Sequence, residues 1–311
     1  MIPRLDDYTL SVPDSLAEAL DDLARHPGAR PFAGGTDLMV VLEAGQLPPG
    51  RYVSLQNCGE LAGVIDDEDG GVSIGALTTY TAILKSARLA HDYPLLGFAA
   101  RETGGVATQN RGTIGGNIAN ASPAADTPPV LLVYDARLEL VSASGSRRVP
   151  YAEFHRGYKK MDLAPGEVIA RVHLPAAAAS PASASGDSKL LPSGGRMSGG
   201  STSYYRKVGT RRAQAISKVC FAGTIRVEAG AVQDVRIALG SVAPTVIRAT
   251  RTEDVLRGQP LDTNAVAAAE RTLLSEIAPI DDIRSTARYR ARVAANLLRE
   301  FLSRATDQEP G

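Results

Sequence analysis

The chain has 311 residues, a length that allows two domains with separate hydrophobic cores. Its 34 basic side chains balance 34 acidic ones, so no overall field attracts nucleic acid or an anionic membrane. Asp6 and Asp7 interrupt the N-terminal segment, no signal peptide is recognisable and no segment is apolar enough to span a membrane, so we expect a cytoplasmic protein. Cys58 and Cys220 are too few for a disulfide framework or an iron–sulfur site within the chain, so any metal is expected on a partner.

The first half of the chain is predicted to mix helices and strands. Leu16, Leu20 and Leu23 share one helical face, which predicts a helix over residues 14–26. A short strand at residues 30–33 is followed by a glycine turn and a helix over residues 38–42, with Thr36 as its N-cap. Further strands are expected at residues 52–55, 72–74 and 138–141, and further helices at residues 79–89 and 93–102.

The second half is predicted to form a separate, smaller unit. Residues 176–203 are dominated by Ala, Ser and Gly without hydrophobic period, which indicates a flexible linker or insertion. Strands at residues 218–227 and 232–239 then form a hairpin, and helices follow at residues 246–256, 263–277 and 285–303. We therefore predict one domain at residues 1–175, a linker at residues 176–203 and an α+β domain at residues 204–305.

Familiar catalytic motifs are absent from the sequence. It contains no G-x-G-x-x-G, no phosphate-binding P-loop and no H-E-x-x-H, which argues against a Rossmann cofactor site. Residues 71–75 match G-x-S-x-G, but Ser73 lies between Val72 and Ile74 and is expected to face outward from a strand rather than to occupy a nucleophile elbow. The four histidines are scattered, so we expect surface or structural roles for them.

Two double-glycine loops are the candidate binding elements. They occupy residues 31–37 and 111–117, and each taken alone reads as an ordinary turn. Glycines let backbone N–H groups approach an anion closely, and a following helix adds partial positive charge. A diphosphate group fits this chemistry.

The sequence around both loops resembles a known family. Residues 113–126 (TIGGNIANASPAAD) closely resemble the second flavin loop of the FAD subunits of molybdenum hydroxylases, and residues 32–37 (FAGGTD) are similar to the first. Residues 154–169 resemble the end of the flavin domain in xanthine dehydrogenases, and residues 204–219 resemble the start of the C-terminal domain of the family. The resemblance covers nearly the whole chain and is closest to the xanthine dehydrogenase FAD subunit.

This resemblance implies an α+β fold with a two-part FAD-binding domain of the vanillyl-alcohol oxidase (PCMH) type, followed by a smaller α+β C-terminal domain. It implies FAD on this chain, and a molybdopterin cofactor and two 2Fe-2S clusters on a large and a small partner subunit. Electrons would pass from those clusters to FAD and on to NAD or another acceptor. A dimer of heterotrimers is implied, without nucleic acid and without membrane insertion.

The resemblance also implies which residues bind the cofactor, and it implies no catalytic side chain and no metal ligand on this chain. The first loop supplies Phe32, Ala33, Gly34, Gly35, Thr36 and Asp37. The second supplies Thr113, Ile114, Gly115, Gly116 and Asn117. Outside the loops, the expected contacts are Asp126, Tyr158, Ile169 and Lys207. Thr103 stands where animal xanthine dehydrogenases place an aromatic residue that stacks on flavin, so that stacking is expected to be missing.

Other functions stay open at this point. The flavin subunit of a carbon monoxide, aldehyde or N-heterocycle dehydrogenase would have the same motifs, because substrate choice resides on the large subunit. A stand-alone vanillyl-alcohol-type oxidase and a flavin-free scaffold subunit are the alternatives from other classes. The arginines 284, 288, 290, 292 and 299 either dock an acidic partner or form a solvated face, and we expect the solvated face.

Overall fold

The computed structural model describes residues 5–176, 194–197, 201–211 and 214–306. The chain forms two compact units, each assembled from separate stretches of sequence. The first unit gathers the residues up to Ser86 with Thr103–Ala121 and Asp135–Ala176, and the second combines Ala87–Glu102 and Ser122–Tyr134 with the described residues beyond Ala176. Two stretches of the first half therefore belong to the second unit, which the predicted division of the chain does not foresee.

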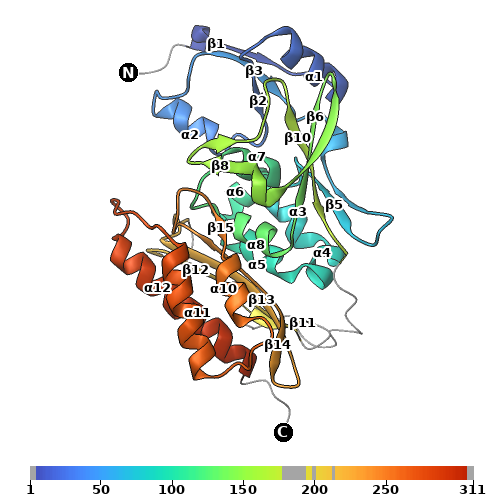
Figure 1. Cartoon of the computed structure of the whole chain (residues 1–311). Helices are drawn as coiled ribbons and strands as arrows, with labels where there is room; N and C mark the ends of the chain where they lie inside the picture. The colour runs from blue at the N-terminus through green and yellow to red at the C-terminus, as the bar shows by residue number, and fades with distance from the viewer. Residues whose placement is uncertain (1–4, 177–193, 198–200, 212–213, 307–311) are drawn as a thin grey trace. The chain divides into compact units, whose positions relative to one another are not determined.

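Figure 1 labels most of the elements of the first unit. Its strands are β1 (Tyr8–Ser11), β2 (Arg30–Phe32), β3 (Gly50–Ser54), β4 (Val64–Asp66), β5 (Val72–Gly75), β6 (Arg137–Ser142), β7 (Gly145–Pro150), β8 (His155–Gly157), β9 (Lys160–Met161) and β10 (Val168–Leu174). Its α-helices are α1 (Leu16–Arg25), α2 (Leu38–Glu43), α3 (Tyr80–Lys85), α6 (Val106–Arg111), α7 (Ile114–Ala119) and α9 (Tyr151–Phe154), with 3-10 turns at Leu5–Asp7 and Gly59–Leu61.

The described strands of the first unit form three sheets. One is parallel with the order β1-β3-β2, one is antiparallel with the order β4-β5-β10-β6-β7, and β8 pairs with β9. The predicted helix over residues 14–26 is confirmed as α1, which begins at Leu16, where Ser15 accepts a hydrogen bond from the Glu18 amide as the N-cap. Leu23 of this helix is buried in one core with Val53 of β3 and Val168 of β10, which joins the parallel sheet to the antiparallel one.

The second unit is built on one antiparallel sheet. Its strands are β11 (Gly194–Met197), β12 (Ser201–Val208), β13 (Val219–Glu228), β14 (Ala231–Gly240) and β15 (Ile247–Arg248), in that order across the sheet. Its helices are α4 (Ala87–Asp92), α5 (Pro94–Glu102), α8 (Pro128–Val133), α10 (Thr250–Leu256), α11 (Thr263–Glu276) and α12 (Ala287–Thr306).

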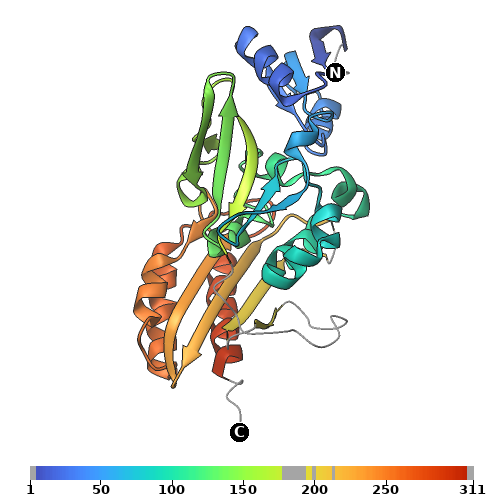
Figure 2. The same cartoon turned by 90° about the vertical axis from the view of Figure 1, so that its right-hand side faces the viewer.

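Helices cover both faces of this sheet, as Figure 2 shows. Alternate residues of β13 point to opposite faces. The Phe221 ring lies 5.5 Å from the Phe301 ring of α12, whereas the neighbouring Cys220 points the other way and contacts the Asp126 carbonyl just before α8. The combination of sheets and packed helices in both units confirms the predicted α+β class.

Several local predictions are corrected by the structure. Ser201 already begins β12 and Gly194–Met197 is strand, so the C-terminal part of the predicted linker is wrong; residues 177–193 lie outside the described residues. The linker prediction failed because Thr202 and Ser203, though small and polar, are buried in the sheet. Helix α10 begins at Thr250 rather than at residue 246, because Ile247 pairs with Leu239 in the sheet. The predicted helix over residues 79–89 is two helices, α3 and α4, separated at Ser86.

One of the arginines predicted to form a solvated face is instead a buried cross-link. Arg290 of α12 is 3% exposed. Its guanidinium donates to the carbonyls of Lys218 and Ser241, at 2.8 and 3.0 Å, and to the Asp282 carboxylate at 2.8 Å. The prediction was therefore wrong for Arg290. Two carbonyls and a carboxylate from distant segments give this charge its partners inside the second unit.

Candidate functional site

The first glycine loop leaves β2 and enters α2. Gly35 has a φ of +75°, a left-handed conformation that side chains other than glycine rarely adopt. A Cβ atom at Gly35 would also lie 2.8 Å from the Phe32 ring, closer than real contacts allow. Asp37 occupies the N-cap position without capping the helix through its side chain, so the predicted Thr36 cap is wrong.

The second glycine loop packs directly against the first. A Cβ atom added at Gly34 would lie 1.9 Å from the Arg111 carbonyl oxygen, and one at Gly112 would lie 3.4 Å from Thr36 Oγ1. Glycine is therefore required at position 34 so that the two backbones can touch. The structure thus brings together the two loops that the sequence separates by more than seventy residues.

The backbone N–H groups of the two loops differ in what they contact. In the second loop, the amides of Ile114 and Gly115 donate to the carbonyls of Thr78 and Ala76 at 3.0 and 2.8 Å, and the Gly116 amide donates to Thr113 Oγ1 at 3.1 Å. These three amides are not free for an anion, contrary to the prediction.

The backbone amides of the first loop differ from those of the second. Within the described ranges, the amides of Gly34, Gly35 and Thr36 donate to no protein acceptor. Open amides beside a left-handed glycine suit the oxygens of a diphosphate. The chain therefore fits an anionic cofactor group at the first loop, with the second loop as its support.

A polar bridge runs from the first loop to the hairpin formed by β8 and β9. The Asn120 side-chain amide, at the end of α7, donates to Asp37 Oδ1 at 3.1 Å. Lys159 in the hairpin turn donates through Nζ to the Asn120 carbonyl at 2.6 Å and also to the Asn120 side-chain oxygen. Tyr158, a predicted cofactor contact, lies next to Lys159 in this turn and is 65% exposed. Sequence reasoning did not select Asn120 or Lys159 as site residues, although both lie within the segments that carry the family resemblance.

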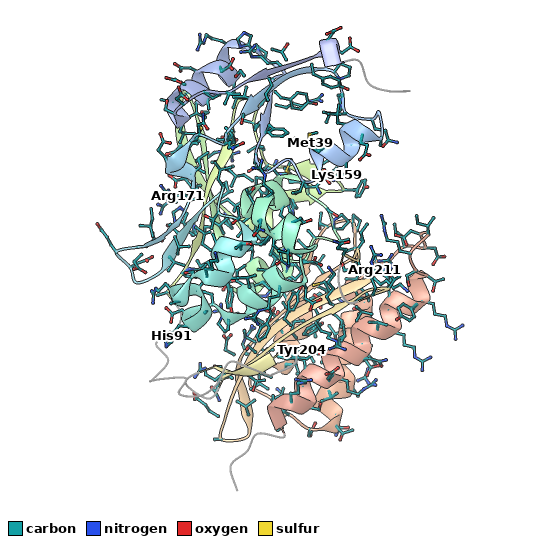
Figure 3. The ribbon with its side chains drawn as sticks, turned by 180° about the vertical axis from the view of Figure 1, so that it is seen from behind. Met39, His91, Lys159, Arg171, Tyr204 and Arg211 are labelled. Carbon is teal, nitrogen blue, oxygen red and sulfur yellow. The ribbon has the colours of Figure 1, made fainter. Side chains whose placement is uncertain are left out.

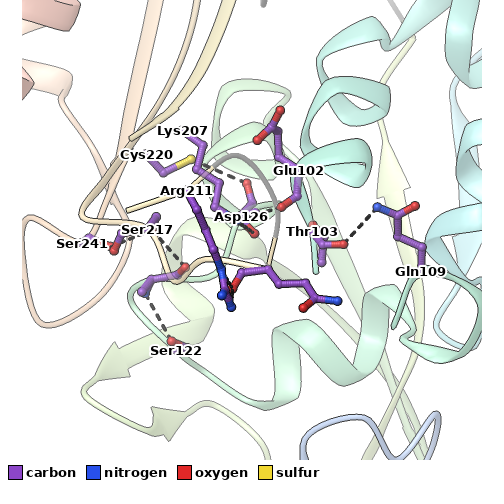
Figure 4. Close-up of polar contacts among 12 residues, drawn as sticks. Glu102, Thr103, Gln109, Ser122, Asp126, Lys207, Arg211, Ser217, Cys220 and Ser241 are labelled. Atoms are coloured by element: carbon purple, nitrogen blue, oxygen red, sulfur yellow. Dashed lines mark hydrogen bonds and ion pairs between the residues drawn. The ribbon is translucent and has the colours of Figure 1, made fainter. Parts of the chain in front are cut away.

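Asp126 and Lys207 form a buried ion pair in the second unit (Figure 4). Lys207 Nζ lies 2.7 Å from Asp126 Oδ2 and also donates to the Glu102 carbonyl at 2.7 Å. Burial raises the pKa of Asp126 to about 6, against the opposing pull of the Lys207 charge. Asp126 Oδ1 is buried without a hydrogen-bond partner in the part of the chain that the structure describes. A buried orphan carboxylate oxygen favours a ligand that donates a hydrogen bond.

Two further residues singled out from the sequence lie in ordered parts of the first unit. Ile169 is 5% exposed in β10, where it pairs with Leu140 just before a β-bulge. Thr103 is 8% exposed, and its carbonyl accepts from the Gln109 side chain at 3.2 Å. Their roles toward flavin stay predictions.

A second polar cluster surrounds His173, which was predicted to have only a surface or structural role. His173 Nδ1 lies 2.6 Å from Ser73 Oγ, and His173 Nε2 lies 3.3 Å from Glu139 Oε2. Ser73 also donates to Asp67 Oδ1 at 2.5 Å. Ser73 is 3% exposed within β5, so the strand prediction is confirmed but the side chain is buried rather than outward-facing. Burial inside a sheet denies Ser73 the access that a nucleophile needs.

Two negative findings concern the described residues alone. None of their helices is long and apolar enough to cross a membrane. No group of three or more His, Cys, Asp or Glu side chains among them could hold a metal ion.

Comparison with known proteins identifies the class of this chain. Residues 6–177 match the family described as FAD binding domain in molybdopterin dehydrogenase. Residues 203–305 match the CO dehydrogenase flavoprotein C-terminal domain. The chain is therefore an FAD-binding oxidoreductase subunit.

Individual relatives agree over nearly the full length. The chain is 31% identical over 291 residues to the xanthine dehydrogenase FAD-binding subunit of Escherichia coli O157:H7, covering 94% of this chain and 93% of the relative. It is 30% identical to the carbon monoxide dehydrogenase medium chain of Afipia carboxidovorans, covering 98% of each. Its fold is similar to a chain of the reconstituted CO dehydrogenase from Oligotropha carboxidovorans, with a TM-score of 0.86, 27% identity and coverage of 99% and 100% of the two chains. The chain belongs to the family of FAD-binding medium subunits of molybdenum hydroxylases, and the predicted resemblance is confirmed.

Proposed function

We propose that this chain binds FAD without a covalent bond and carries electrons from a 2Fe-2S partner subunit to a terminal acceptor. The observation that carries this proposal is the first glycine loop, whose backbone touches the second loop and whose amides at Gly34, Gly35 and Thr36 donate to no acceptor among the described residues. Bound FAD would exchange electrons singly or in pairs. It could therefore connect iron–sulfur clusters, which transfer single electrons, with an acceptor such as NAD that takes a hydride.

The proposed residue roles follow the order of the chain. The first loop, residues 32–37, holds the diphosphate through its open amides, while residues 113–117 support that loop and line its neighbourhood. Ile169 and Tyr158 supply apolar and aromatic contacts from the same unit. Lys207 presents a positive charge that stabilises a reduced flavin, and Asp126 holds that charge in place through the 2.7 Å ion pair.

The proposed partners are a large molybdopterin subunit and a small subunit with two 2Fe-2S clusters, assembled as a dimer of heterotrimers in the cytoplasm. The only two cysteines of the sequence, Cys58 and Cys220, support this division, because both are free and buried and cannot hold a cluster. NAD is the proposed acceptor. The whole enzyme is proposed to be a molybdenum hydroxylase of the xanthine dehydrogenase type, in which the large subunit selects the substrate.

Spectroscopy of the purified chain tests the proposal. Oxidised-flavin absorption bands that acid precipitation releases into the supernatant, and that NADH bleaches under anaerobic conditions, are the expected result. A colourless protein that cannot be reconstituted with FAD would refute flavin binding. Flavin that dithionite reduces but NADH does not would refute NAD as the acceptor and leave FAD binding intact.

A further inference from the structure

The first glycine loop holds an electrostatic conflict. Its open amides suit a diphosphate, yet Asp37 follows Thr36 directly and adds a carboxylate at the same loop. The Asp37 carboxylate would repel a diphosphate bound at this loop, and the repulsion would weaken binding unless a positive charge offsets it. The polar bridge links the Asp37 carboxylate to one such charge, the Lys159 ammonium in the turn of the hairpin formed by β8 and β9.

The bridge connects this carboxylate to a lysine through a single amide side chain. Asn120 has one donor group, which contacts Asp37 Oδ1 at 3.1 Å, and one acceptor oxygen, which accepts from Lys159. An amide placed between an ammonium and a carboxylate is polarised by both, because its oxygen faces the cation and its N–H faces the anion. The three residues thus form one amide-bridged ion pair.

The backbone at the lysine end is held in an uncommon conformation. Lys159 has a φ of 55°, and Ala121, the residue after Asn120, has a φ of 48°. Non-glycine residues in the left-handed region cost free energy, and they persist where the surrounding contacts hold them. Here they occur at Lys159 and at the residue that follows Asn120, and the Lys159 ammonium donates to both Asn120 oxygens. Figure 3 labels Lys159, together with Met39 of α2.

We propose that Lys159 is a positioning residue for the anionic part of the cofactor: acting through Asn120, it offsets the Asp37 charge so that the first glycine loop can take a diphosphate. This inference rests on the proposed function. It assigns Lys159 no direct contact with the ligand, and it predicts that the lysine is needed only while Asp37 carries a charge.

A double-mutant cycle on the full-length chain separates this role from a direct contact. FAD and, separately, ADP are titrated at low ionic strength against the wild type, Lys159→Met, Asp37→Asn and the double variant, with flavin fluorescence and calorimetry as readouts. Lys159→Met is expected to weaken both ligands by on the order of fivefold, the scale of one exposed ion pair. The double variant is expected to bind as the wild type does.

Salt and a neighbouring lysine supply the controls. The defect of Lys159→Met should disappear at about 1 M salt, where exposed charges are screened within roughly 3 Å. Lys160→Met, which removes the exposed lysine next in the chain, should leave both affinities unchanged. Thermal unfolding of each variant verifies that the fold is kept.

Three results would overturn the inference. They are an unchanged affinity in Lys159→Met, a double variant as weak as Lys159→Met, and an equal loss in Lys160→Met. A wild-type chain that binds neither FAD nor ADP would instead refute the proposed function itself, so the two failures are distinguishable.

Discussion

Replacing Gly34 by alanine gives the sharpest test of how the two glycine loops depend on each other. The added Cβ would lie 1.9 Å from the Arg111 carbonyl oxygen and 2.8 Å from the Arg111 carbonyl carbon, whereas real contacts essentially never fall below 3.0 Å. The loops must therefore separate by about 1 Å. Since the obstructing atoms are backbone, no side chain can rotate away, and we expect a loss of about 3 kcal/mol in the free energy of unfolding.

Chemical denaturation and FAD titration measure the two expected effects. Gly34→Ala should lower the denaturation midpoint and weaken FAD by at least about tenfold, because a displaced first loop no longer presents its amides together. Gly59→Ala is the matched control, since a Cβ at Gly59 meets nothing within 4 Å. A Gly34→Ala variant as stable and as tightly FAD-binding as Gly59→Ala would refute the inferred contact between the loops.

Four further single variants test buried charges by urea denaturation across a pH series. Arg51 holds the pKa of Asp22 at about 2 instead of 3.8, so the Asp22–Arg51 pair stabilises the fold fully above about pH 4 and loses this effect as pH falls through 2. Asp22→Asn should therefore lower the free energy of unfolding by about 2 kcal/mol at pH 7. An unchanged denaturation midpoint would contradict the pairing. Burial raises the pKa of Asp126 from 3.8 to about 6, so its contribution to stability falls as pH rises between those values, and Asp126→Asn should flatten that slope. Lys207→Met leaves the Asp126 carboxylate without its counter-ion and should lower the free energy of unfolding by about 3–5 kcal/mol. Adding Asp126→Asn to the same chain should restore part of this loss, and additive losses in the double variant would exclude the ion pair. Arg290→Met should cost about 3 kcal/mol or more, because two carbonyls and a carboxylate lose their donor, and wild-type stability would show that this cross-link is dispensable.

Elements defined by local pattern were predictable from the sequence. The leucines of α1 recur at helical spacing and Ser15 caps the helix, so its limits depend on contacts within one or two turns. The hairpin between β13 and β14 is equally local, because Ala229 and Gly230 both adopt positive φ in the turn that the sequence indicated. The family was recognisable for a similar reason, since the two glycine loops are continuous stretches of sequence.

Predictions from local sequence pattern were wrong where contacts with a distant part of the chain determined the structure of a residue. Ile247 has the spacing of a helix residue, yet it pairs with Leu239 and extends the sheet. Arg290 reads as one of several solvated arginines, yet three segments of the second unit surround it with acceptors. In both cases long-range hydrogen bonds outweigh local preference, which is worth only tenths of a kcal/mol per residue.

The sequence by itself determined that the chain carries two glycine loops of a flavin-binding family, and that its two cysteines cannot hold a cluster. Only the tertiary structure decided that the amides of the second loop are occupied, because Ile114 and Gly115 donate to the carbonyls of Thr78 and Ala76 from a different segment of the chain. It also decided that Lys207 meets Asp126, across 81 positions of the chain, and that Lys159 reaches Asp37 through Asn120. Hydrogen-bond partners of this kind depend on packing between distant segments, which no periodicity of residue types encodes.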